Sequence, residues 1–224
     1  MVESISVESA ILTLLPSLIG AISGSLGGNI ISNYLKERNE KESKRRFIID
    51  MYLIQLQDFT EALWHRFNNI KNKGGRLIMD NTYFEESTLY SLGCILAYRR
   101  ILLFEGIYSQ IDNLIPGLGI FLKEKLNDID KMLDGGKISL YRYNRLLLAE
   151  VIIEKENGKL NICSYLKFKE KYEEQKYIKN FLNPSKEWVS NLRGHEVEPM
   201  MRKLREIIER ITQETKIETN INKI

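Results

Sequence analysis

Few residues of this chain have the type and spacing that chemistry requires. Nucleophilic catalysis needs a nucleophile, a base and an orienting group, and the only histidines are His65 and His195. His65 follows Trp64 within a helical pattern, which favours a structural role. The segment HEVEP begins at His195 like a zinc-binding helix, but Pro199 stands where the second histidine would be. The sequence therefore predicts no catalytic residue and no metal site.

Other candidate groups also favour structural roles. Asp128, Asp130 and Asp134 lack the glycine and the closing glutamate of a calcium loop, so a solvated acidic face is expected. Cys94 and Cys163 lie in apolar surroundings with no Cys or His at metal spacing, so we expect buried, reduced thiols. No glycine loop ends in Lys-Ser or Lys-Thr, as a phosphate-binding loop would. We expect no cofactor.

Charged side chains interrupt the most apolar segment of the chain at Arg99, Arg100 and Glu105. Buried charges must pair, so Glu105 is expected to meet an arginine of a neighbouring helix, or Arg100 to reach a carboxylate such as Glu61. One interpretation is a structural ion pair. The other is a site between helices for an anionic ligand or partner.

The bulk properties describe a globular protein. The length of 224 residues suits one domain with an appendage, and 43% hydrophobic with 28% charged residues is an ordinary folded composition. The net charge of +3 is small and both signs are interleaved. This balance argues against a strongly electrostatic nucleic-acid binder, so no nucleic acid is expected as a partner.

A long uncharged run lies near the amino terminus. Residues 9 to 35 contain 27 consecutive positions without Asp, Glu, Lys, Arg or His, and a bilayer span needs about 20 mainly apolar residues. A basic border follows at once, made of Lys36, Arg38, Lys41, Lys44, Arg45 and Arg46. By the positive-inside rule the carboxyl side of the run faces the cytoplasm. We expect a single-pass protein of the cell membrane, with the amino terminus outside and the bilayer as a partner.

Three alternatives to a membrane span stay open. A cleaved signal peptide needs a basic start, whereas the charges before the run are Glu3 and Glu8. A buried hairpin broken at Pro16 or at Gly27-Gly28 would make the chain soluble, and a surface helix would do the same. Neither of these explains the abrupt basic border.

Small residues recur every fourth position in the run, at Gly20, Gly24, Gly28 and Ser32. Residues four apart lie on one helix face, and helices in lipid associate through close backbone approach. The stripe therefore predicts a packing seam and a homo-oligomer. The alternative is that Gly and Ser are simply frequent in membrane helices. A pore lined by Asn29 and the serines of several copies is a further hypothesis.

Beyond residue 46 the apolar spacing is helical almost throughout. Glycine and proline breaks divide the pattern into helices at 49–70, 86–113, 118–133, 140–157, 164–182, 185–193 and 197–211, with a short strand at 159–163. The predicted fold is all-α, with a single transmembrane helix before a cytoplasmic helical bundle. The predicted divisions are 1–35, the border 36–46, the bundle 47–215 and a frayed tail 216–224.

Two pieces of the bundle carry a resemblance, ALWHRFNNI at 62–70 and STLYSLGCILAYRRILLFE at 87–105. They resemble a family of uncharacterised proteins with a hydrophobic amino terminus, in which an Arg-x-x-Asn-Ile segment precedes a Ser-Thr-Leu-Tyr helix that closes in an acidic residue. The matching positions here are Arg66, Asn69, Ile70, Ser87, Thr88, Leu89, Tyr90 and Glu105. The resemblance implies a single recurring helical domain and carries no information about reactions.

Together these features predict a membrane-anchored helical interaction protein without enzymatic activity. It would act as a scaffold, adaptor or sensor that self-associates through its membrane helix and contacts a further protein. A second hypothesis is a membrane-disrupting, pore-forming effector triggered through its cytoplasmic domain. A third is a soluble helical protein with a buried amino-terminal hairpin.

Overall fold

The computed structural model describes residues 35–72, 81–134, 140–216 and 219. The chain divides into two units, Met1–Arg46 and Phe47–Ile224. In the first unit residues 35–46 are helical, and Lys36, Arg38 and Lys41 of the basic border are exposed on this helix. Arg46 forms an ion pair with Glu42, with 3.5 Å between Nε and Oε1.

The predicted membrane helix falls mostly on residues 1–34, which lie outside the described residues. The same holds for the small-residue stripe of Gly20, Gly24, Gly28 and Ser32. Among the residues that the structure describes, no helix has both the length and the apolar character that a bilayer span requires.

The second unit is predominantly helical, which confirms the all-α prediction at the level of fold class. Its elements in chain order are η1 (Ile49–Leu53), α2 (Ile54–Lys71), α4 (Asn81–Phe104), α5 (Ile107–Leu114), α6 (Leu118–Met132), α7 (Arg142–Ile152), β1 (Ile153–Glu156), β2 (Lys159–Ile162), α8 (Tyr165–Glu174), α9 (Lys176–Asn191) and α10 (Gly194–Thr215).

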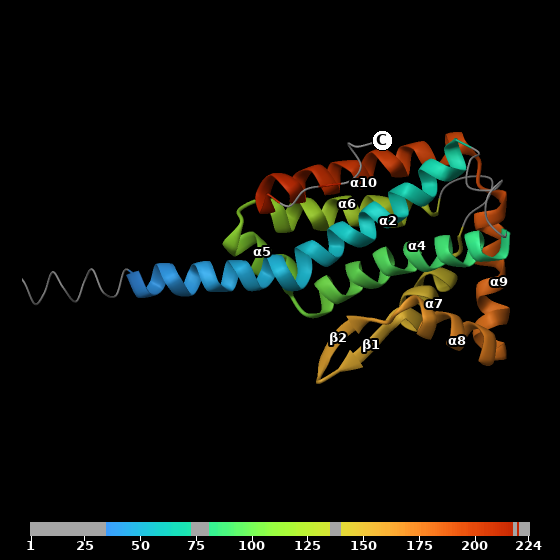
Figure 1. The fold of residues 1–224 in the computed structure, drawn as a ribbon, viewed down its shortest axis with the longest axis horizontal. Coiled ribbons are helices and arrows are strands. Elements are labelled where there is room, and N and C mark those ends of the chain that lie inside the picture. Colours follow the sequence, from blue (N-terminus) through green and yellow to red (C-terminus); the bar gives the residue numbers. More distant parts are fainter. Residues whose placement is uncertain (1–34, 73–80, 135–139, 217–218, 220–224) are drawn as a thin grey trace, which may run out of the picture. The chain divides into compact units, whose positions relative to one another are not determined.

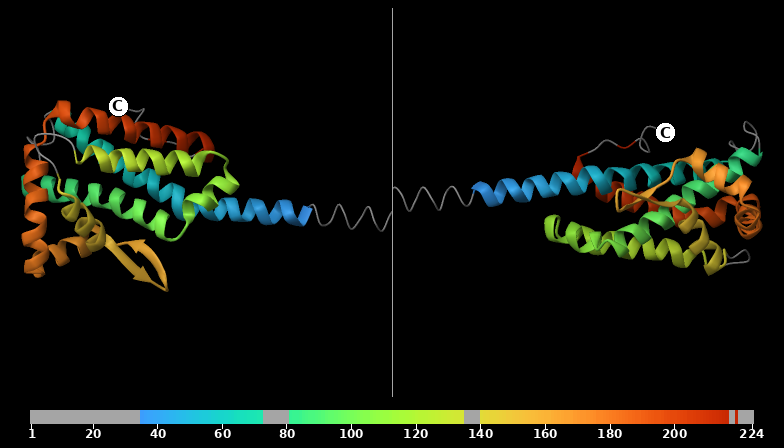
Figure 2. Two further views of the ribbon diagram at one scale, coloured as in Figure 1. Left: turned by 180° about the vertical axis from the view of Figure 1, so that it is seen from behind. Right: turned by 90° about the horizontal axis from the view of Figure 1, so that it is seen from below.

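Helix α4 is the centre of the unit, in contact with α2, α5, α6, α7, α8 and α9 (Figure 1). Its Leu89 and Leu92 are fully buried, as expected of a helix that is apolar on most faces. Helices α2 and α10 run side by side along most of their length, although they are far apart in the sequence (Figures 1 and 2). Phe67 of α2 and Leu204 of α10 are fully buried in the shared core.

The predicted helix at 86–113 is in fact two helices. Helix α4 ends at Phe104, and Gly106 adopts a left-handed conformation with φ of 66° before α5 begins. Glycine takes this conformation without the steric cost that a side chain adds, so it ends helices readily. The apolar periodicity continued across the break because both helices face the same core.

The predicted helix at 140–157 ends early, at Ile152 of α7. The following residues form an antiparallel hairpin, in which β1 pairs with β2 and Ile153 lies opposite Ile162. The prediction of a strand near 159–163 is confirmed, and its partner was wrongly assigned to the helix. Asn157 and Gly158 both have positive φ, 50° and 82°, which is the conformation that a two-residue hairpin turn requires.

The predicted break at Asn183-Pro184 is also wrong, because Pro184 lies inside α9. The chain breaks instead at Gln175, whose backbone is extended. A proline inside a helix costs about 3 kcal/mol. Here Leu182 and Ser185 are both fully buried, so the face of α9 that packs on the core continues through the proline and offsets that cost.

Candidate functional site

The structure brings the predicted arginines Arg99 and Arg100 together at one small pocket between α4, α6 and α7, with a volume of about 110 Å³. We call the charged residues in and around this pocket the arginine cluster; they are Arg99, Arg100, Arg142, Arg145, Asp130, Asp134 and Glu150. Arg145, whose side chain is 5% exposed, is the most deeply buried of these charges.

The buried members of the arginine cluster are paired. Arg145 Nε lies 3.0 Å from Asp130 Oδ1, and Nη1 bonds to Asp134 and donates to the carbonyl oxygen of Leu140 at 2.7 Å. Arg99 Nη1 lies 3.4 Å from Asp130 Oδ2. The hydrogen bond from Arg145 holds the pKa of Asp134 below its usual value. Two of the three aspartates that the sequence placed on a solvated face therefore bind arginines.

Glu105 and Glu61 do not join the arginine cluster as expected. Glu105 follows the end of α4, and its carboxylate accepts hydrogen bonds from Tyr52 Oη at 3.2 Å and from Leu160 N at 2.9 Å. It therefore ties the hairpin to the helices. Arg100 reaches Glu150, at 3.1 Å between Nη2 and Oε1, and Glu61 accepts from Gln57. The helix break at Gly106 changes the direction of the chain next to Glu105. The spacing of residues along an unbroken helix could not predict the resulting position of the Glu105 side chain.

The histidines and cysteines lie at separate places in the unit. His65 makes an edge contact with Trp64, with 5.3 Å between ring centroids, and His195 is exposed at the start of α10. Cys94 and Cys163 are buried and form no disulfide, and burial raises the pKa of Cys94 to about 12. Within the described residues, no three His, Cys, Asp or Glu side chains gather closely enough to hold a metal ion.

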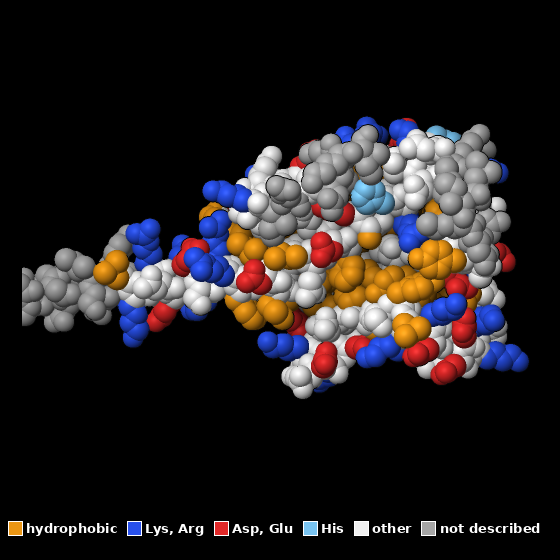
Figure 3. All heavy atoms as spheres, in the orientation of Figure 1, with side chains coloured by type: hydrophobic (Ala, Val, Ile, Leu, Met, Phe, Trp, Pro, Cys, Tyr) orange, Lys and Arg blue, Asp and Glu red, His pale blue; other side chains and the backbone are white. Residues whose placement is uncertain are grey.

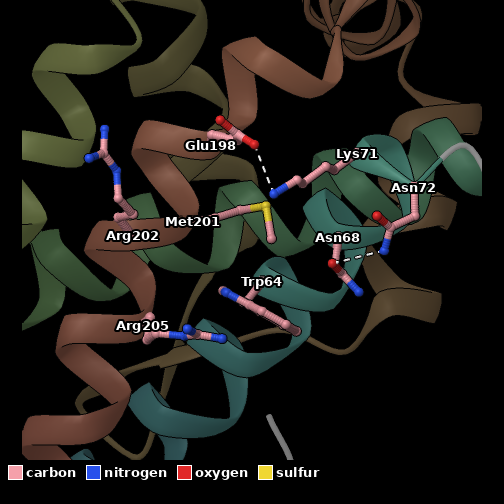
Figure 4. Close-up of a pocket in the computed structure, with 8 residues that line it drawn as sticks. All are labelled: Trp64, Asn68, Lys71, Asn72, Glu198, Met201, Arg202 and Arg205. Carbon is pink, nitrogen blue, oxygen red and sulfur yellow. Dashed lines mark hydrogen bonds and ion pairs between the residues drawn. The ribbon is translucent and has the colours of Figure 1, made fainter. Parts of the chain in front are cut away.

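A larger pocket lies between α2 and α10, with a volume of about 640 Å³ (Figure 4). We call it the α2/α10 pocket, and its lining comprises Trp64, Asn68, Lys71, Asn72, Glu198, Met201, Arg202 and Arg205. Ligand sites in proteins commonly measure about 300 to 1,000 Å³ and combine an apolar floor with a few polar groups. The volume of the α2/α10 pocket lies in this range, and its lining is mainly polar, with Trp64 and Met201 as its apolar residues.

Two helical stripes build the α2/α10 pocket. Trp64, Asn68 and Lys71 follow one another at spacings of four and three on α2, so they face the same side. On α10 the matching stripe has spacings of three and four and consists of Glu198, Met201 and Arg205.

Gly194 allows the two helices to converge at one end of the pocket. A Cβ atom at this position would lie 3.2 Å from the Cα of Lys71, which is tighter than ordinary van der Waals contact. The missing side chain therefore lets the start of α10 pack against the end of α2.

The floor of the α2/α10 pocket is apolar and its rim is charged. Trp64 and Met201 are 6% and 8% exposed. Arg205 extends toward Trp64 in Figure 4, with its guanidinium carbon 5.6 Å from the ring centroid, while Arg202 points away from the floor. Lys71 Nζ lies 2.8 Å from Glu198 Oε1, an ion pair that joins the two helices.

The charges of the α2/α10 pocket do not balance. Lys71, Arg202 and Arg205 face one carboxylate, Glu198, whose pKa is lowered chiefly by the hydrogen bond from Lys71. Among the residues that the structure describes, Arg202 and Arg205 form no ion pair with a carboxylate. The pocket therefore carries a surplus of positive charge and can attract an anion.

Sequence reasoning did not find the α2/α10 pocket. Its residues have the ordinary spacing of amphipathic helices, and the two stripes lie about 130 positions apart in the chain. Two features were available as signals: a tryptophan bordered by polar residues on α2, and the recurrence of Arg202 and Arg205 on one helix face. Neither shows that the two segments meet.

Comparison with family models, with curated proteins and with solved structures finds no match to this chain.

Proposed function

We propose that this chain is a membrane-anchored helical interaction protein that self-associates through its amino-terminal segment and works as a sensor. The observation that carries the proposal is the 27-residue uncharged run at residues 9 to 35, followed directly by the basic border. A run of this length matches a bilayer core, and the positive charges favour the cytoplasmic side. The proposed location is the cell membrane, with the second unit in the cytoplasm.

The second unit supports a role in binding rather than catalysis. The α2/α10 pocket is lined by an ion pair and arginines, and its lining residues include no nucleophile in contact with a base. It also exposes large apolar side chains, among them Phe47, Leu103 and Phe104, and apolar side chains form a band over α4 in Figure 3. Exposed apolar patches are typical of protein contact surfaces. Of scaffold, adaptor and sensor, the α2/α10 pocket favours the sensor.

Membrane partition of the full chain tests the anchor. Membranes from expressing cells are washed with high salt and with carbonate, and the chain is expected to stay in the pellet until detergent is added. Replacing Ile19 and Ile22 with arginine is expected to move the chain to the supernatant. Each arginine near the centre of a span costs about 2.5 to 3.5 kcal/mol.

The matched control replaces Ile19 and Ile22 with leucine, which keeps the segment apolar and is expected to leave partition unchanged. A wild-type chain that stays in the supernatant without detergent would contradict the membrane anchor. The soluble protein with a buried hairpin would then be the better interpretation.

Self-association has its own measurement. Cross-linking of the full chain in detergent micelles is expected to give oligomers, and Gly24→Leu is expected to reduce them because a large side chain separates the packed backbones. Leu26→Ile changes a residue outside the stripe and serves as the control. Equal cross-linking of all three proteins would contradict the packing seam.

A further inference from the structure

The lining of the α2/α10 pocket restricts the chemistry of its ligand. The surplus of positive charge on Lys71, Arg202 and Arg205 selects an anionic group over a neutral or cationic one. Lys71 is held by Glu198, at 2.8 Å, whereas the two arginines form no ion pair within the described part of the chain, although the charge of Arg202 also contributes to lowering the pKa of Glu198. An anion of the ligand is therefore expected to bind chiefly to the arginines.

The floor of the α2/α10 pocket suits a flat ring. Arg205 already lies over the indole of Trp64, with 5.6 Å between its guanidinium carbon and the ring centroid. A guanidinium is planar and stacks on aromatic rings through either face. The face of Arg205 that is turned away from Trp64 can therefore receive a second ring (Figure 4).

Two amide side chains lie at the edge of the α2/α10 pocket. Asn72 Nδ2 donates to Asn68 Oδ1 at 3.2 Å. This bond leaves the Nδ2 group of Asn68 as a donor and the Oδ1 atom of Asn72 as an acceptor. A ring with both donors and acceptors on its edge could pair with this couple, whereas a purely hydrocarbon ring could not.

From these three features we propose that the α2/α10 pocket binds a small anion that carries a flat, hydrogen-bonding ring, the chemical class of the nucleoside monophosphates. The phosphate group pairs with the cationic rim, the base stacks on the guanidinium of Arg205, and the asparagines bind the edge of the base. The volume of about 640 Å³ accommodates a molecule of this size. This inference rests on the sensor part of the proposed function.

Tryptophan fluorescence of the full chain in detergent micelles tests the proposal. The chain has two tryptophans, so Trp188→Phe leaves Trp64 as the single reporter in the pocket. Adenosine monophosphate is titrated as the probe, and adenosine and inorganic phosphate are titrated separately as its two parts. We expect a saturable change with adenosine monophosphate, and binding of each part that is at least about tenfold weaker.

Variants of two arginines on the same helix connect binding to the pocket. Arg205→Ala is expected to weaken binding of adenosine monophosphate by about 10- to 100-fold, because it removes both the stacking surface and a charged donor. Arg210→Ala is the matched control, since Arg210 pairs with Glu214 and does not line the pocket. It is expected to leave the affinity unchanged.

If the tryptophan fluorescence does not respond, calorimetry on the wild-type chain measures the binding of adenosine monophosphate directly. Absence of binding at about 1 mM adenosine monophosphate would overturn the proposal, because such a ligand gains less than about 4 kcal/mol. Phosphate binding as tightly as the nucleotide, or an unchanged affinity in Arg205→Ala, would overturn it as well. A chain that partitions into membranes but fails these tests loses the ligand class and keeps the anchor, so the two failures are distinguishable.

Discussion

Arginine side chains have opposite environments in the arginine cluster and at the α2/α10 pocket. In the arginine cluster, Arg145 is 5% exposed and is held by Asp130, Asp134 and the carbonyl oxygen of Leu140. At the α2/α10 pocket, Arg202 and Arg205 are exposed and form no ion pair among the described residues. One group of arginines is neutralised within the fold, and the other is left for a ligand.

The difference follows from the cost of burying a charge. A guanidinium that leaves water must recover its hydration through ion pairs and hydrogen bonds, so it persists in the interior only when its partners are built in. An exposed guanidinium keeps its hydration and needs no partner. The comparison teaches that charge in the interior of this protein supports folding, while unpaired charge at the rim of a pocket is available for binding.

The largest expected effect is that of Arg145→Ala. Removing this side chain leaves Asp134 and the buried carbonyl oxygen of Leu140 without this partner and leaves Asp130 with Arg99 alone, so the free energy of unfolding is expected to fall by about 1 to 3 kcal/mol. The measurement is urea unfolding of the full chain in detergent micelles, followed by circular dichroism. Arg142→Ala is the matched control, because Arg142 lines the same small pocket but is exposed. Equal effects of the two variants would remove the contrast between buried and exposed arginines.

A smaller effect is expected for Arg100→Ala. Its partner Glu150 is 58% exposed, and its guanidinium carbon lies 5.3 Å from the ring centroid of the exposed Phe104. An exposed ion pair and an exposed cation–π contact together contribute about 1 kcal/mol. The same urea experiment measures it. A loss as large as that of Arg145→Ala would show that Arg100 is as essential to the interior as Arg145.

The pH dependence of stability isolates the contribution of Asp134 from the contributions of the neighbouring charged residues. Its pKa in the folded chain is depressed below the usual 3.8, so its stabilising contribution is complete above that value and is lost as the pH falls through the depressed pKa. Asp134→Asn is expected to be less stable than the wild type near neutral pH, with a difference that shrinks on acidification. Urea midpoints between about pH 3 and pH 7 give the measurement. A difference that is constant with pH would contradict the Arg145 contact as its cause.

The smallest effect on stability is expected for Arg205→Ala. The side chain is exposed, has no carboxylate partner in the described structure and contributes one cation–π contact with Trp64. The free energy of unfolding is expected to fall by about 0.5 kcal/mol, although nucleotide binding is expected to fall sharply. Combined unfolding and binding measurements on one preparation check this separation. A large loss of stability would place Arg205 with the paired arginines of the interior.

The sequence predicted helices well where apolar residues recur without interruption, as in α2, α6 and α10. It failed where the pattern continued across a break, at Gly106, or where a break signal was overridden, at Pro184. It also extended α7 into β1, because a four-residue strand is too short to establish its own period. At Gly106 the left-handed glycine decided, while at Pro184 the burial of Leu182 and Ser185 on the core decided.

The functional residues were predicted less completely than the helices. Charged residues in an apolar helix drew attention to Arg99 and Arg100, but not to their partners, since Asp130 and Glu150 lie on other helices. The α2/α10 pocket gave no signal of its own, because neither of its helices is unusual in isolation.

The sequence by itself determined the helical class of the second unit, the uncharged run with its basic border and the lack of a recognisable catalytic motif. These depend on composition and on residues near one another in the chain. Only the tertiary structure decided which arginines are neutralised and which face an open pocket. Ion pairing and pocket shape depend on side chains from distant helices, and the distances between those side chains are set by the packing of the whole core.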